Sequence, residues 1–169
     1  MDPQLERALQ AIGAATRGMT GERLAAHPEG KWSAAGILEH LSIAFGSTAR
    51  SLEKALASGE LKVSPPTLYQ RGAALLVAGI GYFPPGRKAP EFTRPKGMEG
   101  ETALRTIREN LVAMDSAITR CEERFGRSRK IANHPVLGPL NVPQWRKFHL
   151  VHTRHHMKQI DRLRGQFSQ

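Results

Sequence analysis

Apolar residues recur at steps of three and four, without interruption, over residues 104–125. This spacing places them on one face of an α-helix, and Gly126 follows as a stop signal. An apolar seam of that length is stable in water when another helix covers it. The segment therefore predicts a fold in which helices pack lengthwise. The seam consists of Leu104, Ile107, Leu111, Met114, Ile118, Cys121 and Phe125.

Three other segments have the same helical spacing and recognisable ends. The first covers residues 2–18 and has Asp2 as its N-cap. The second covers residues 33–59 and begins with Ser33, another good N-cap. The last begins at position 141 or 142 and ends near Gly165. Four amphipathic helices in one chain predict an antiparallel four-helix bundle.

The segments between the helices differ in length and composition. Residues 64–100 are rich in proline and glycine, which predicts a long crossover with one short helix around residues 68–78. Residues 131–142 look like a turn-rich connector and not like a strand. We therefore expect an all-α protein, with a single domain over residues 1–169. The order of residues leaves open whether the crossover acts as a lid over a site or only as a spacer.

Composition narrows the classes of function. The 25 Lys and Arg outnumber the 15 Asp and Glu, giving a net charge of +10, but the cations are scattered and accompany no nucleic-acid motif. We expect a solvated surface, with nucleic acid as the weaker alternative. The one cysteine, Cys121, lies within an apolar series and should be a core residue. The lack of an export signal, of a membrane span and of paired cysteines favours a cytoplasmic protein.

The last helical segment contains the residues with the clearest chemical potential. His152 and His156 are four apart, so both imidazoles project from one face and could hold a single divalent ion. His149 lies within about 60° of them on a helical wheel, whereas His155 lies to the side. Ligands on one helix diverge, so a ligand from a second helix is needed. His40, on the apolar stripe of residues 33–59, could complete a three-nitrogen set.

Three neutral imidazoles would suit zinc or nickel and leave a coordination position for water or substrate. Gln159 could hydrogen-bond a ligand ring. Glu39 and Asp115 are weaker candidates for hydrogen bonds to the metal ligands. The alternative is that His40 is a core histidine bonded to a backbone carbonyl, and that His152 and His156 lie on a solvent-exposed helix surface. Spacing alone does not decide between the two, because histidines four apart are common and lack the glutamate of the zinc-protease motif.

Several motifs together resemble the DinB-like superfamily of metalloenzymes. Its members show a Trp-Ser helix start leading to a His-Leu, here Trp32-Ser33 and His40-Leu41. They also show a late His-x-x-x-His-x-x-Gln-Ile, which matches residues 152–160. One branch of the superfamily also resembles residues 84–90 and 134–149. Met157-Lys158 departs from the His-Arg-Gly-Gln that many members show, which affects the expected pocket and thiol site.

The resemblance implies a fold and a set of site residues. It implies an up-down-down-up bundle, often dimeric, with metal ligands at His40, His152 and His156 and a neighbouring polar residue at Gln159. His149 and His155 do not match ligand positions. Characterised members include transferases and isomerases that use low-molecular-weight thiols.

These expectations combine into two hypotheses about function. The first is a zinc- or nickel-dependent enzyme, a thiol-dependent transferase or a hydrolase, that acts on a small-molecule substrate as a homodimer. Because Cys121 is the only cysteine, a reactive thiol would have to come from outside. The second is a non-catalytic binding or stress-response module that the metal stabilises.

Overall fold

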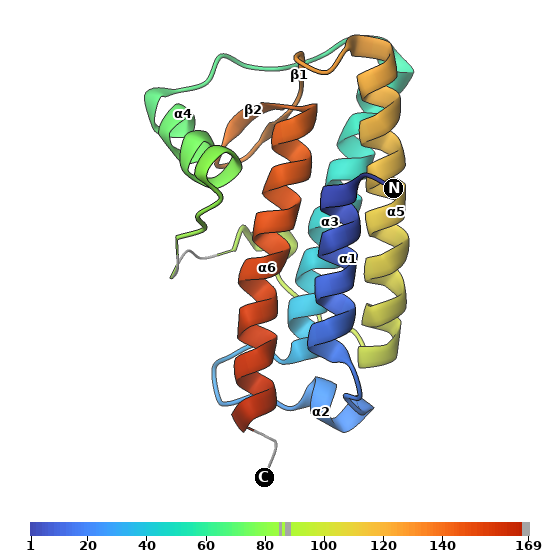
Figure 1. The fold of residues 1–169 in the computed structure, drawn as a ribbon, viewed down its shortest axis with the longest axis vertical. Coiled ribbons are helices and arrows are strands. Elements are labelled where there is room, and N and C mark those ends of the chain that lie inside the picture. The colour runs from blue at the N-terminus through green and yellow to red at the C-terminus, as the bar shows by residue number, and fades with distance from the viewer. Residues whose placement is uncertain (85, 87–88, 167–169) are drawn as a thin grey trace.

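Helices make up most of the computed structural model, which describes residues 1–84, 86 and 89–166. Four helices of this part of the chain lie side by side along the long axis of the molecule (Figure 1). They are α1 (Pro3–Thr16), α3 (Ala34–Ser58), α5 (Gly100–Phe125) and α6 (Val142–Gln166). The expectation of a mainly helical protein is confirmed, with one small sheet that the sequence did not indicate.

The long helices pack in two pairs. α3 packs mainly against α5, and α1 packs mainly against α6. The colour gradient in Figure 1 shows α3 and α5 running in one direction and α1 and α6 in the opposite direction. Because two successive long helices, α3 and α5, are parallel, the chain between them must return along the whole length of the molecule. That requirement accounts for the long crossover.

Side-chain caps fix the helix starts where the sequence predicts them. The side chain of Asp2 accepts from the backbone N–H of Gln4 at 2.9 Å, and Ser33 Oγ accepts from Gly36 N–H at 3.0 Å. At the start of α6, Gln144 N–H donates to Asn141 Oδ1 at 3.1 Å. α5 begins earlier than its apolar seam, because the carboxylate of Glu99 caps its first turn.

The apolar seam of α5 lies in the core. The side chains of Ile107, Leu111, Met114, Ile118 and Cys121 are fully buried. Burial raises the pKa of the Cys121 thiol to about 11, so the cysteine is an inert core residue, as expected. In the part of the chain that the structure describes, no helix combines the length and apolarity needed to span a bilayer.

The prediction of a strandless connector over residues 131–142 is wrong. β1 (Lys130–His134) and β2 (Gly138–Asn141) form an antiparallel hairpin in which Asn133 lies opposite Pro139. A proline within so short a run obscures the strand pattern, but an edge strand tolerates it because one side needs no ladder bond. Gly138, at φ 70°, supplies the left-handed conformation that closes the turn.

The crossover contains more helix than expected. The predicted short helix is α4 (Leu68–Ala74), which continues into the π-helix η1 (Leu75–Ile80). A single 3-10 turn, η2 (Glu91–Thr93), follows in the crossover. Outside the crossover, the short helix α2 (Gly21–Ala25) lies between α1 and α3. Of the motif at residues 84–90, Pro85, Arg87 and Lys88 lie outside the described residues.

Candidate metal centre

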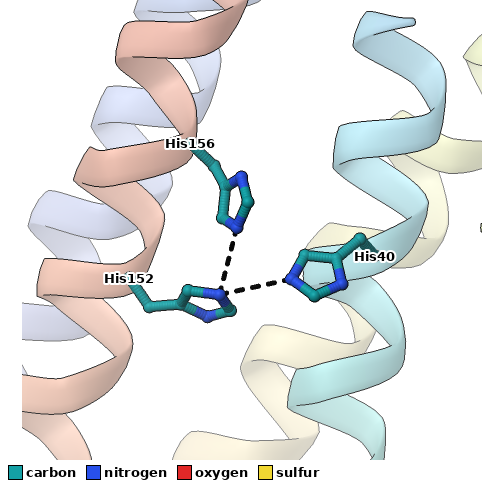
Figure 2. A group of neighbouring side chains, drawn as sticks. All are labelled: His40, His152 and His156. Atoms are coloured by element: carbon teal, nitrogen blue, oxygen red, sulfur yellow. Dashed lines mark hydrogen bonds between the residues drawn. The ribbon is translucent and has the colours of Figure 1, made fainter. Parts of the chain in front are cut away.

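Three histidine rings from two helices meet inside the molecule. His152 and His156, one turn apart on α6, point toward His40 on α3 (Figure 2). His152 Nε2 lies 3.2 Å from His40 Nε2 and 3.1 Å from His156 Nε2. The three side chains are only 3%, 6% and 7% exposed for His40, His152 and His156. The sequence prediction that these three residues come together is therefore met by the geometry.

The spacing of the three rings fits a single divalent ion. One nitrogen from each ring lies within 4.8 Å of the others. In a tetrahedral site with zinc–nitrogen bonds of ~2.0–2.1 Å, ligand nitrogens are about 3.3 Å apart. The distances of 3.1 and 3.2 Å between the Nε2 atoms are close to that value. The three histidines could therefore hold a metal ion.

Hydrogen bonds on the far side of two rings fix which nitrogen faces the cluster unprotonated. His40 Nδ1 donates to the backbone carbonyl of Thr93, in η2, at 2.9 Å. His156 Nδ1 donates to Gln159 Oε1 at 2.8 Å. Both acceptors require a proton on Nδ1, which leaves a lone pair on each Nε2. This carbonyl bond is the one expected of a core histidine, and it is also the kind of hydrogen bond that would orient His40 if it bound a metal ion.

Without an ion the cluster cannot satisfy its own hydrogen-bonding groups. The Nε2 of His152 faces two lone pairs but can carry only one proton to share between them. With the proton of His152 on Nδ1 instead, all three Nε2 atoms would offer lone pairs, and a cation between them would remove this mismatch. The donor set therefore fits a divalent metal ion. The evidence for this fit is that His40 and His156 both carry their proton on Nδ1.

Aromatic rings hold His152 where a hydrogen bond does not. Its Nδ1 is buried and has no hydrogen-bond partner within the described residues. Phe83 and Phe148 stack on the ring instead, each with a centroid distance of 5.3 Å. The packing fixes the plane of the imidazole, so that Nε2 points at the other two rings. Phe83 comes from the crossover, which carried no sequence signal for this role.

Burial keeps the three rings in the neutral form that binds metals. Desolvation lowers the pKa of His40, and a hydrogen bond to Thr93 opposes part of that shift. Desolvation also lowers the pKa of His156, to about 3, and the pKa of His152 falls well below its ordinary value. The rings are therefore uncharged at neutral pH, and no carboxylate belongs to the group within the described residues.

The two carboxylates expected as weaker outer candidates bond elsewhere. Glu39, although next to His40, accepts the backbone N–H groups of Lys96, Gly97 and Met98 at 2.9, 3.1 and 2.8 Å. Asp115 accepts from the backbone N–H of Asp2 at 3.1 Å. Glu39 thus anchors the end of the crossover, a few residues after the Thr93 carbonyl that orients His40.

Replacing Glu39 by alanine should lower the free energy of unfolding by about 2 kcal/mol, because three backbone N–H groups lose a charged acceptor. Urea unfolding followed by circular dichroism measures this loss. Glu39→Gln keeps one acceptor oxygen, which can serve two of the three N–H groups, and should lose less than Glu39→Ala. Equal stabilities for wild type and Glu39→Ala would show that these three hydrogen bonds do not stabilise the fold.

The remaining histidines near the cluster have other partners. His149 is fully buried, and its Nε2 lies 3.2 Å from Thr48 Oγ1. His155 is half-buried beside Phe83 and contacts Gln159. Burial, followed by the charges of nearby cations, lowers its pKa. His134 Nδ1 accepts two backbone N–H groups in the hairpin turn. Among the described residues, the group of side chains that could hold a metal ion includes neither His149 nor His155, the two histidines that do not match ligand positions.

A large cavity opens onto the cluster. Its volume is about 1480 Å³, and its lining includes His40, His152 and His156. The wall is largely apolar, which favours small organic molecules over hydrated ions. The crossover contributes one side of this wall, so the segment is part of the site. The aromatic residues of the lining are Trp32, Tyr69, Phe83, Phe92, Trp145 and Phe148.

Comparison with known proteins identifies one match. A family model described as the DinB superfamily matches residues 4–160, which is most of the chain. No curated protein and no solved structure matches the chain. The matched residues include all three clustered histidines and Gln159.

Proposed function

This chain belongs to the DinB superfamily, and we propose that it is a divalent-metal-dependent enzyme whose ion is held by His40, His152 and His156. The observation that carries the proposal is the convergence of three neutral, buried imidazoles, two of which direct an Nε2 lone pair at the Nε2 of the third. A purely structural zinc site would close the coordination sphere with a fourth side chain. The described residues offer only three ligands here, which supports a position for an exchangeable partner.

The proposed reaction is either a group transfer that depends on an external low-molecular-weight thiol or a hydrolysis. The chemistry that a bound ion supplies is Lewis acidity, which lowers the pKa of a water or thiol that binds to it. Zinc and nickel are the proposed metals, since both suit imidazole ligands. The chain's own thiol cannot serve, because Cys121 is fully buried and burial raises its pKa to about 11. An external thiol is therefore required for the transferase reaction.

The residues around the cluster supply binding and exclusion of water. The ring centroids of Trp32 and His40 are 5.2 Å apart, and Phe83 stacks on His152. The cluster therefore has aromatic neighbours that line the cavity. Such walls bind the apolar part of a small-molecule substrate. Gln159 Oε1 accepts a hydrogen bond from His156 Nδ1, so the proton of that ring lies on the side away from the cluster.

We also propose the assembly that the family resemblance implies. The directions of the four long helices in Figure 1 support an up-down-down-up bundle within a single domain. A homodimer is supported by the exposed apolar side chains of the crossover, Leu68 at 85%, Leu75 at 65% and Ile80 at 70% exposed. Analytical ultracentrifugation should give twice the 18.7 kDa of one chain, and a monomer at all concentrations would contradict the dimer.

The experiment that tests the enzyme proposal has two steps. Protein expressed with zinc or nickel in the medium should contain about one ion per chain. The loaded protein should then hydrolyse an activated ester, or couple a thiol such as glutathione to an aromatic electrophile, faster than the chelated protein. Metal-dependent stability without any turnover would favour the alternative, a non-catalytic module. A protein that takes up neither metal would contradict both.

A further inference from the structure

His155 does not match a ligand position, yet it is coupled to the metal centre through one amide. Gln159 Nε2 lies 3.3 Å from His155 Nε2, and Gln159 Oε1 lies 2.8 Å from His156 Nδ1. The amide therefore bridges two neighbouring imidazoles of α6. His155 lines the same cavity as the cluster, and the Phe83 ring that covers His152 also packs on His155, at 4.7 Å.

The bridge has a direction, because an amide donates at one end and accepts at the other. With the Gln159 nitrogen donating to His155 Nε2, its oxygen faces His156 and requires the proton on Nδ1. The Nε2 of His156 then presents a lone pair to the cluster. If the amide turned over, its nitrogen would donate to His156 Nδ1, and the ring would carry its proton on Nε2. In that state the proton points at the cluster and blocks coordination.

We propose that His155 is a positioning residue: its Nε2 is the acceptor that fixes the orientation of the Gln159 amide and, through it, the tautomer of His156. The inference rests on the proposed function, since it concerns the ligand of the proposed ion. Without an acceptor at position 155, the two orientations of the amide become similar in energy. Part of the protein then holds His156 in the wrong tautomer, which lowers metal affinity.

The test compares His155→Leu with His155→Gln. Leucine removes the acceptor, whereas glutamine can place Oε1 near the position of the imidazole Nε2. Zinc affinity is measured by competition with a chromophoric chelator, after circular dichroism has shown that both variants fold. His155→Leu should bind zinc roughly tenfold more weakly, the lower end for loss of an outer partner. His155→Gln should remain within about threefold of wild type.

A second background isolates the mechanism. In Gln159→Glu the carboxylate can only accept, so it holds the Nδ1 proton of His156 without help from His155. His155→Leu should then cost almost nothing in zinc affinity, which gives a double-mutant cycle with a coupling of about tenfold. A purely structural role for His155 would cost the same in both backgrounds and would overturn the proposal.

Nitrogen-15 NMR of the metal-free protein provides a readout that does not need the ion. Wild type should show His156 with its proton on Nδ1, and His155→Leu should show a mixture with the Nε2–H form. A wild-type ring protonated on Nε2, or a variant that keeps the pure Nδ1–H form, would overturn the inference. If wild type bound no zinc, the proposed function would fail separately, and these tautomer populations would still decide the role of His155.

Discussion

Replacing His152 by alanine is expected to lower zinc affinity by more than about 100-fold, because the loss of a mere outer partner already costs 10–100-fold. The Nε2 of His152 is the atom that lies within 3.2 Å of both other rings, so its removal leaves two nitrogens from different helices. Two ligands cannot enclose a divalent ion at the tetrahedral geometry that zinc adopts. Chelator competition and metal content after dialysis measure the loss.

The matched control is another buried histidine on the same helix. His149→Gln should keep full zinc affinity, because the His149 Nε2 is directed at Thr48 Oγ1 and not at the cluster. A glutamine amide can donate the same bond to Thr48. Equal zinc binding by wild type and His152→Ala would remove the proposed metal centre. An equal loss in His149→Gln would mean that zinc affinity reports general damage to α6.

The helices were predictable because local physics determines them. The seam of α5 and the caps at Asp2 and Ser33 use residues that are close in sequence, and these features appear in the structure where the pattern places them. The hairpin was missed because its strands are short and Pro139 interrupts the pattern. Its stability comes from distant packing, since Ile131 and Leu140 are buried in the shared core. No local rule contains that information.

The site was predictable to the extent that side chains carry the signal. Histidines four apart on one helix, and a third on the apolar stripe of another, indicate a shared interior position for three rings. The Thr93 carbonyl that orients His40 has no such signal, because any residue supplies a carbonyl. Phe83 was missed for a related reason: the crossover has no helical period to tell which side chain turns inward. Glu39 was a weaker candidate for a hydrogen bond to the ligands, but consecutive helix residues point in different directions, and its carboxylate binds the backbone of the crossover.

Acid should destabilise the metal-free protein, and His149 should account for about 3 kcal/mol of the effect at about pH 4.5. Complete burial lowers the pKa of His149 from 6.5 to about 3. Above pH 6.5 the ring is neutral in both the folded and the unfolded chain, so it contributes no pH dependence. Below that value the unfolded chain binds a proton that the native ring does not, and the free energy of unfolding falls as the pH falls toward 3. The difference of two pH units between 6.5 and 4.5 sets the magnitude.

The hydrogen bond to Thr48 shows which nitrogen of His149 carries the proton. The Thr48 hydroxyl donates to the carbonyl of Ala44 at 3.0 Å, so its oxygen must accept from His149 Nε2–H at 3.2 Å. The other nitrogen, Nδ1, is buried and has no partner within the described residues that could accept from a second N–H, which favours the neutral ring. Protonation would place an unpaired charge in the core, which explains why the native ring resists it.

The variant His149→Gln separates this contribution from the other buried histidines. His134 and His156, with pKa values lowered to about 4 and about 3, add acid sensitivity of the same sign, so wild type should lose more than the His149 share. The glutamine variant keeps the donor to Thr48 but cannot titrate. Urea unfolding of chelator-treated protein at about pH 7.5 and about pH 4.5 should show a stability loss that is ~3 kcal/mol smaller in the variant than in wild type. Identical losses would contradict the prediction, because they would mean that the native His149 binds a proton as readily as the unfolded chain does.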